Sequence, residues 1–151
     1  MKNKPLQSFG GLALFLIALG APCHASAAET GALDPGHKVV IQVSSADPEV
    51  QNLALNNASN LQQLLGMDNV KIEVVAYGPG LSILTGESKM PERVQSLEAQ
   101  GVRFSACHVT MLGIERRTGH LPKLIDGVVV VPGGVVRIID LQQRGWSYIR
   151  P

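Results

Sequence analysis

Apolar residues along this chain follow two spacings, that of strands and that of helices. A β-branched run over residues 39–43 is typical of a short, mostly buried strand. Asp47-Pro48 then provides a cap and a proline for a first helical turn, and Gly66 provides a stop. Between them, the apolar residues at helical spacing are Val50, Leu53, Ala54, Ala58, Leu61 and Leu65. A strand followed by a capped helix is half of a βαβ unit.

The alternation of strands and helices continues after Gly66. Residues 70–77 predict a second strand, in which Lys71 and Glu73 indicate a face that is partly exposed at its beginning. The apolar cluster over residues 81–84 predicts a turn of helix, and a clearer helix begins at Pro91 and ends at Gly101. A third strand over residues 102–106 then leads directly to Cys107.

The C-terminal part of the chain completes the pattern. We expect a short helical segment over 108–117, and a strand over 127–131 that is apolar throughout, as a central parallel strand covered on both faces would be. The next helix carries Val135, Ile138 and Ile139 on one face, and Trp146, Tyr148 and Ile149 form a last strand. Five strands and about four helices predict an α/β fold, a three-layer α/β/α sandwich of Rossmann or flavodoxin type with a largely parallel five-stranded sheet.

In such a fold, right-handed crossovers bring the loops that follow the strands to one edge of the sheet. Those loops are residues 44–47, 78–80, 107–110 and 132–134. Ligands of open α/β sheets bind in the crevice at this edge. We therefore expect Cys107 to stand in a crevice that Gly78, Gly80, Thr110 and Gly133 help to form.

The first 27 residues have the order of a secretory signal. Lys2 and Lys4 precede an uncharged apolar run over residues 10–21, and Ala25-Ser26-Ala27 follows it. The run is too short for a comfortable membrane anchor, and Pro22 directly before Cys23 argues against a lipid attachment site. We predict cleavage near Ala27, a flexible leader over 28–36, a single domain over 37–151 and a periplasmic protein without a stable membrane anchor.

The charge balance excludes one class of partner. The chain has 13 basic and 12 acidic residues, and cleavage would remove two of the basic ones, so the mature chain would be close to neutral. Proteins that bind nucleic acid usually carry a basic patch, and no such stripe is present in this sequence. We expect no nucleic-acid partner.

Cys107 is the residue with the most evident chemistry. Cleavage would remove Cys23, leaving Cys107 as the only thiol of an exported protein, with no partner for a disulfide in the same chain. A thiol between a strand end and a helix start meets unpaired backbone N–H groups, which favour the nucleophilic thiolate. His108 follows directly and is a second catalytic candidate. The alternative is that Cys107 is a small, buried, inert side chain.

Other motifs point to chemistry less directly. Gly78-Pro79-Gly80 lacks the spacing of a glycine-rich phosphate loop, and Pro132-Gly133-Gly134 is explained by a tight turn before a helix. Cys107, His108 and His120 could be soft-metal ligands, but no second cysteine or regular spacing supports a metal site. We predict neither a metal nor a cofactor.

The sequence resembles the DsrE/DsrF-like family of small sulfur-handling proteins. The segments that carry the resemblance cover nearly all of the mature chain; they are Val74 to Gly80, Gly101 to Cys107, Val131 to Val135 and Leu141 to Pro151. The resemblance implies a three-layer α/β fold, homo-oligomers that are often trimers or hexamers, and a cysteine that carries sulfur as a persulfide. By motif position that cysteine is Cys107. The export signal departs from what the resemblance leads us to expect, and so does His108-Val109-Thr110, where the resemblance implies a more polar segment.

Three hypotheses follow for the function. A thiol peroxidase or disulfide reductase usually needs a resolving thiol, whereas a sulfur carrier needs only one cysteine. The first hypothesis is a periplasmic sulfur-transfer protein that takes sulfane sulfur from a donor and yields it to an acceptor thiol, on a protein or a small molecule. The second is a non-catalytic oligomeric binding or assembly module with a buried cysteine. In the third, Cys107 forms a mixed disulfide with a partner.

Overall fold

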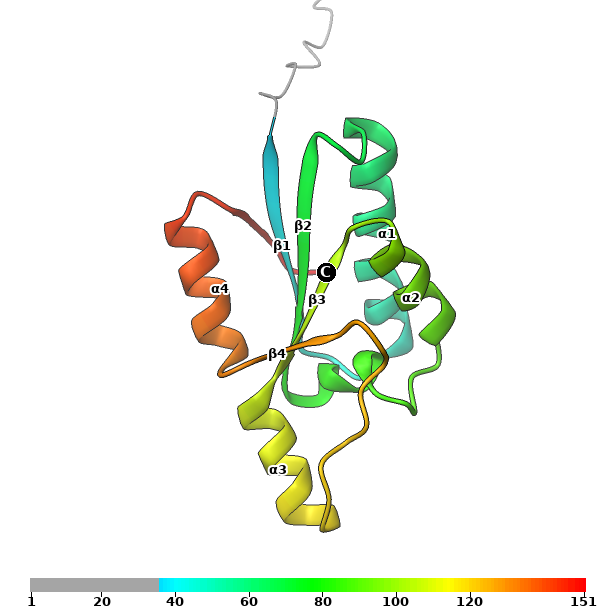
Figure 1. The fold of residues 1–151 in the computed structure, drawn as a ribbon, viewed down its shortest axis with the longest axis vertical. Coiled ribbons are helices and arrows are strands. Elements are labelled where there is room, and N and C mark those ends of the chain that lie inside the picture. Colours follow the sequence, from blue (N-terminus) through cyan, green and yellow to red (C-terminus); the bar gives the residue numbers. More distant parts are fainter. Residues whose placement is uncertain (1–35) are drawn as a thin grey trace, which may run out of the picture. The chain divides into compact units, whose positions relative to one another are not determined.

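The computed structural model describes residues 36–151, which form a five-stranded sheet with helices on both faces (Figure 1). The strands are β1 (His37–Val43), β2 (Val70–Ala76), β3 (Arg103–Cys107), β4 (Val129–Val131) and β5 (Ser147–Ile149). Their order is β4-β3-β2-β1-β5, and every neighbouring pair is parallel. The predicted α/β class is confirmed, with a sheet that is parallel throughout.

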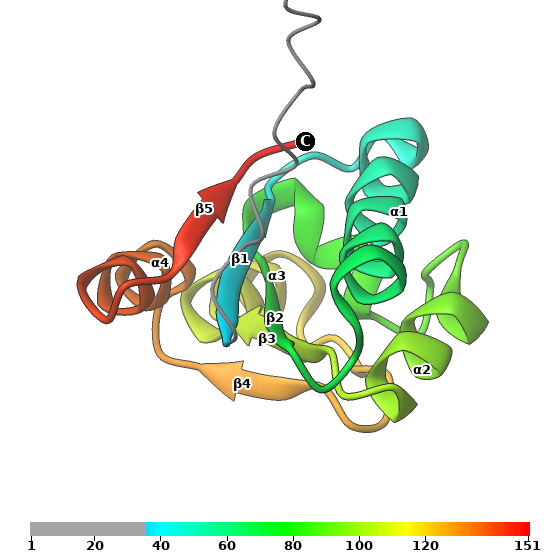
Figure 2. The ribbon, with the colours of Figure 1, turned by 90° about the horizontal axis from the view of Figure 1, so that it is seen from above.

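The helices form the outer layers. They are α1 (Pro48–Leu65), the 3-10 helix η1 (Gly78–Leu84), α2 (Pro91–Ala99), α3 (His108–Thr118) and α4 (Gly134–Gln143). Figure 2 shows α1 and α2 on one side of the sheet and α4 on the other. Helix α1 begins where the sequence predicts, since the Asp47 side chain accepts a hydrogen bond of 2.9 Å from the N–H of Glu49, and it ends at Gly66.

The α1 side of the sheet holds the larger core. Val70, Ile72, Val74 and Ala76 of β2 all point to this side, as their alternation predicts, and pack with side chains of α1, η1 and α2. Phe104 of β3 is completely buried at the centre of this core. Burying a side chain of this size contributes about 1.5–3 kcal/mol, so this side supplies most of the hydrophobic stabilisation.

The α4 side has a smaller apolar cluster and buried polar groups beside it. Val40 and Val75 pack against Ile138 and Leu141 of α4, with Tyr77 and Trp146 at the margin. The expectation of a partly exposed face at the beginning of β2 holds for Lys71 but is wrong for Glu73, whose side chain is 1 % exposed. A carboxylate can be buried only when it is paired and hydrogen-bonded, and Glu73 has such partners.

Strand β4 is not the central strand that its apolar sequence predicts. It lies at one edge of the sheet and pairs only with β3, so that Val129 and Val130 are 38 % and 46 % exposed. A continuous apolar run is typical of a strand covered on both faces, but an edge strand can have the same sequence.

The apolar spacing predicts the wrong buried residues in two helices, α1 and α4. Leu53 of α1 is 47 % exposed, while Gln51 and Gln62 are buried because their side-chain amides bond to the Ser45 and Gln100 carbonyls. In α4, Val135 and Ile139 are exposed, and the buried residues are Gly134, Ile138 and Leu141. Apolar spacing alone does not reveal a polar side chain that finds a buried partner.

The predicted signal segment over 1–27 and the leader to residue 35 lie outside the described residues. Among the helices formed by residues 36–151, none combines the length and apolar character that crossing a membrane requires.

Candidate functional site

The loops that follow the first four strands meet at one edge of the sheet, as the parallel topology predicts. The Tyr77 N–H donates to the Val43 carbonyl over 3.1 Å, which joins the ends of β1 and β2. Gly80 lies so close to the same carbonyl that a Cβ atom there would be 2.3 Å from the Val43 oxygen. Only glycine fits at this position, so Gly80 has a packing role.

Two further contacts connect the loops after β3 and β4 to the segment that follows β2. The Gly78 N–H donates to the Thr110 hydroxyl over 2.9 Å, which links η1 to α3. At the start of α4, a Cβ atom on Gly134 would be 2.9 Å from the Tyr77 Cβ. The absence of a side chain at Gly134 therefore allows the beginning of α4 to approach the end of β2.

Cys107 lies where these contacts converge. It is the last residue of β3 and the N-cap of α3, and it is 5 % exposed. Burial raises the pKa of its thiol, but hydrogen bonds from the Thr110 hydroxyl and from the backbone N–H groups of Gly134, Thr110 and Val109 lower it. The hydrogen bonds outweigh burial, so the pKa of Cys107 is lower than that of an ordinary thiol.

The donors around Cys107 come from two helix beginnings. Val109 and Thr110 belong to the first turn of α3, and Gly134 is the first residue of α4. The N–H groups of a first helical turn have no partners within the helix, and they carry the positive end of its dipole. The Thr110 hydroxyl accepts from Gly78, which leaves its own hydrogen free for the sulfur.

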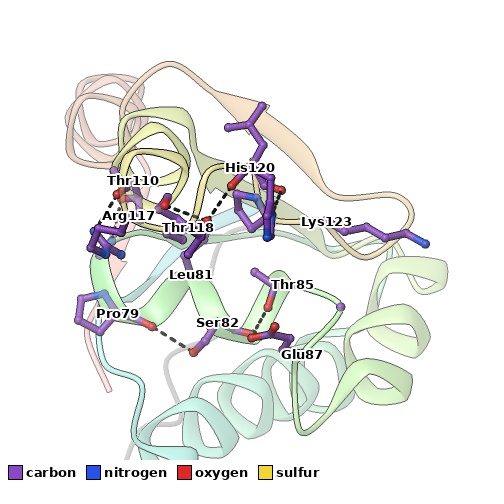
Figure 3. A pocket seen from close by; sticks show the side chains of 16 residues that line it. Pro79, Leu81, Ser82, Thr85, Glu87, Thr110, Arg117, Thr118, His120 and Lys123 are labelled. Atoms are coloured by element: carbon purple, nitrogen blue, oxygen red, sulfur yellow. Dashed lines mark hydrogen bonds between the residues drawn. The ribbon is translucent and has the colours of Figure 1, made fainter.

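A pocket of about 790 Å³ lies beside Thr110, between η1 and α3 (Figure 3). Gly78 and Thr110 line it, whereas Gly80 is buried behind it and Gly133 is the N-cap of α4, outside its lining. Cys107 is not a lining residue either, but Thr110, which lines the pocket, hydrogen-bonds to its thiol. The structure thus brings two of the four predicted crevice residues to the pocket, and a third, Gly133, to the helix start beside the thiol.

His108, the second catalytic candidate, is exposed on the first turn of α3. It is not among the groups that shift the pKa of Cys107. Its position next to Cys107 in sequence therefore does not translate into an interaction that activates the thiol. Within residues 36–151, no cluster of three or more His, Cys, Asp or Glu side chains is placed to hold a metal ion.

A buried ion pair that sequence reasoning missed connects α4 to the sheet. Arg137 donates to both carboxylate oxygens of Glu73, over 2.8 and 2.7 Å, and the Ser105 hydroxyl donates to Glu73 Oε1 over 2.6 Å. The contact with Glu73 raises the pKa of Arg137. The one available signal was an acidic residue within an otherwise apolar strand. This pair holds the helix whose first N–H group bonds to Cys107.

The comparisons with known proteins agree with this architecture. The model of the DsrE/DsrF-like family matches residues 37–151, and the chain belongs to this family, which generally works in sulfur relay. No curated protein is significantly similar to the chain.

Several solved structures are similar to this one, and two of them are described below. The first is MTH1491 from Methanobacterium thermoautotrophicum, described as a protein of unknown function, with 39 % identity and a TM-score of 0.68. The second is the YchN protein from E. coli, with 21 % identity and a TM-score of 0.58, a likeness that shows the fold alone. Each similarity covers 76 % of this chain and 99 % of the other.

Proposed function

We propose that this protein is a sulfur carrier, which takes up sulfane sulfur as a persulfide on Cys107 and passes it to an acceptor thiol. The observation that carries the proposal is the position of Cys107 between the beginnings of α3 and α4, where hydrogen bonds lower the pKa of the thiol. Thiolate is the form that attacks sulfur, so these donors increase the reactive fraction at neutral pH.

In the proposed step, the Cys107 thiolate attacks the outer sulfur of a donor persulfide, R–S–SH. A bond forms between the Cys107 sulfur and that outer sulfur, the donor's S–S bond breaks, and R–S⁻ leaves. Cys107 then carries an S–SH group, and an acceptor thiolate removes the outer sulfur by the same exchange. The outer sulfur is transferred with no external oxidant or reductant.

The low exposure of Cys107 favours sulfane transfer over a mixed disulfide with a partner protein. Cys107 is 5 % exposed, and a mixed disulfide would require a bulky second chain at this buried position, whereas a persulfide adds a single sulfur atom. The donors that stabilise the thiolate would also stabilise the ionised outer sulfur of a persulfide.

The experiment is to incubate the purified chain with inorganic polysulfide and to measure its intact mass. The chain has two cysteines, so Cys23→Ser is the matched control for Cys107→Ser. We expect a gain of one sulfur atom in the unaltered chain and in Cys23→Ser, and no gain in Cys107→Ser. The proposal fails if the unaltered chain gains nothing, or if the gain on a single site persists in Cys107→Ser.

The same low exposure supports a second candidate function, a non-catalytic binding module in which Cys107 is only packed. That function requires the thiol of the folded protein to resist a small alkylating reagent at neutral pH. Rapid labelling of Cys107 in the folded protein would contradict it.

We also propose that the protein is periplasmic and that it assembles into homo-oligomers. The assembly is supported by exposed apolar side chains of α4, where Val135, Val136 and Ile139 are 53 %, 68 % and 49 % exposed. Cell fractionation and sedimentation of the purified protein test the two proposals, and a cytoplasmic monomer would contradict both.

A further inference from the structure

The pocket beside Thr110 has the size and the position of a binding site. Pockets for small organic ligands have volumes of roughly 300–1,000 Å³, and this one has about 790 Å³. Its walls come from η1 with the residues that follow it, from α3, and from residues 120–123 (Figure 3). Thr110 lines this space, and its hydroxyl also hydrogen-bonds to the sulfur of Cys107, which does not line it.

Gly113 keeps the α3 wall of this pocket open. It lies inside α3, where glycine costs about 1 kcal/mol of helix stability relative to alanine. Its backbone does not require glycine, because φ is not positive and a Cβ atom would make only ordinary contacts, at 3.7 and 3.8 Å, with the guanidinium groups of Arg117 and Arg116. Neither strain nor close packing explains Gly113, whereas the open pocket in front of it does.

The lining combines an apolar interior with a cationic excess. Leu81, Ile114 and Leu121 provide apolar surface, and the charged residues of the lining are Arg117, Lys123 and Glu87. Within residues 36–151, neither Arg117 nor Lys123 forms an ion pair. Arg117 donates one N–H to the Gly113 carbonyl over 2.9 Å, so the rest of its guanidinium is available to a ligand.

We propose that this pocket binds the organic part of the sulfur donor, and that the donor is a small organic persulfide bearing carboxylate groups. The inference rests on the proposed function of Cys107. A carboxylate pairs with Arg117, the carbon skeleton lies on the apolar lining, and the terminal S–SH group extends past Thr110 to the thiol. Cys107 accepts the outer sulfur, and the organic thiolate stays in the pocket until it dissociates.

The experiment compares two donors on the same chain. Glutathione persulfide has an organic body with carboxylates, whereas inorganic polysulfide reaches the thiol without one. We measure the initial rate of sulfur gain by intact mass in the unaltered chain, in Gly113→Leu, which fills the pocket, and in Arg117→Gln. Arg116→Gln is the matched control, because Arg116 is the preceding arginine of the same helix and does not line the pocket.

We expect Gly113→Leu to slow loading from glutathione persulfide at least about tenfold, which corresponds to about 1.4 kcal/mol of lost binding. Arg117→Gln should slow it severalfold. Loading from inorganic polysulfide should stay within about twofold in both variants, since pocket binding is not used. Arg116→Gln should behave as the unaltered chain with both donors.

The possible failures are distinguishable. If polysulfide loads the chain but Gly113→Leu and Arg117→Gln load normally from glutathione persulfide, Cys107 is a sulfur carrier and the pocket assignment is wrong. Equal slowing with both donors would place the effect on the thiol and would also overturn the assignment. If neither donor loads the unaltered chain, the proposed function fails and this inference fails with it. Should Gly113→Leu not fold, the pair Arg117→Gln and Arg116→Gln decides alone.

Discussion

The two faces of the sheet are built on different principles. On the α1 side, α1, η1 and α2 cover the strands with a continuous apolar core centred on residues such as Phe104. On the α4 side, a single helix packs on a small apolar cluster and is tied to β2 by the ion pair of Arg137 with Glu73. Cys107 also lies on the α4 side, because Ser105 and Cys107 of β3 point to the opposite face of the sheet from Phe104.

The α1 side of the sheet mainly stabilises the fold, whereas the α4 side positions the groups around the thiol. The α1 side of the sheet gives the fold most of its hydrophobic stabilisation. The contacts on the α4 side set the position of α4 relative to Cys107. The N–H of Gly134 can reach Cys107 only when α4 lies in this place, and a bidentate ion pair positions α4. Substitutions on the two faces should therefore differ in what they change.

The largest effect should follow from Phe104→Ala on the apolar face. Deleting a fully buried phenyl ring removes its transfer free energy and leaves a cavity, which together cost about 3–5 kcal/mol of unfolding free energy. Urea denaturation measures this loss. Leu64→Ala is the control, since Leu64 is 84 % exposed, and should change stability by less than about 0.5 kcal/mol.

The next largest effect is expected for Arg137→Met, which should lower the free energy of unfolding by about 3 kcal/mol. The substitution leaves the Glu73 carboxylate buried without its main partner. The loss is at the low end for a buried pair, since Arg103 remains 3.6 Å from Glu73 and Arg137 is itself 23 % exposed. The double variant Glu73→Met/Arg137→Met should recover much of the stability. Additive losses in that double variant would contradict the role of the pair.

The control for Arg137→Met is Arg144→Met in the same helix. Arg144 forms an exposed ion pair of 2.8 Å with Asp140, and its side chain is 66 % exposed. Exposed pairs contribute about 0–1 kcal/mol, so this substitution should have a small effect in the same urea titration. Equal losses at Arg137 and Arg144 would show that burial of Glu73 does not matter.

A smaller effect, on reactivity, is expected for Thr110→Val. Valine keeps the shape but removes the hydroxyl that bonds to the thiolate, so the pKa of Cys107 should rise. A hydrogen bond to a charged group contributes about 1.5–3 kcal/mol, so alkylation at pH 7 should slow about tenfold. Thr118→Val, at the other end of α3, is the control, because the Thr118 hydroxyl bonds to the Ile114 and His120 carbonyls. Unchanged labelling in Thr110→Val would contradict the activation by Thr110.

The smallest effect should be that of Val130→Thr on the edge strand β4. Val130 is 46 % exposed, so an added hydroxyl remains hydrated and stability should change by less than about 0.5 kcal/mol. Val74→Thr, at a fully buried position of β2, should cost about 1–3 kcal/mol because its hydroxyl loses water. Similar losses in both variants would mean that β4 is covered.

The sequence predicted the fold well because the local signals were strong. The cap at Asp47, the proline at Pro91 and the alternation in β2 each have one physical reading, and parallel topology brings the loops together. The position of Cys107 at the end of β3, before a helix, followed from the same signals.

What could not be predicted depends on contacts between distant residues. Burial of Glu73 requires Arg137, which is 64 positions away, and the edge position of β4 depends on strand order rather than on its apolar sequence. The pocket is lined by residues from three separate segments, among them Gly113, which belongs to no sequence motif. Low exposure of Cys107 was not evident either, since a strand end can be open or covered.

The central claim is that hydrogen bonds from the beginnings of two helices lower the pKa of Cys107 and so favour its thiolate form. The most direct measurement is the rate at which iodoacetamide labels the folded Cys23→Ser chain as a function of pH, which reports the pKa of Cys107. The lowered pKa predicts that labelling rises through a midpoint below about 8.5, the ordinary value for a free thiol. A midpoint at or above about 8.5, or no labelling of the folded chain, would contradict the account.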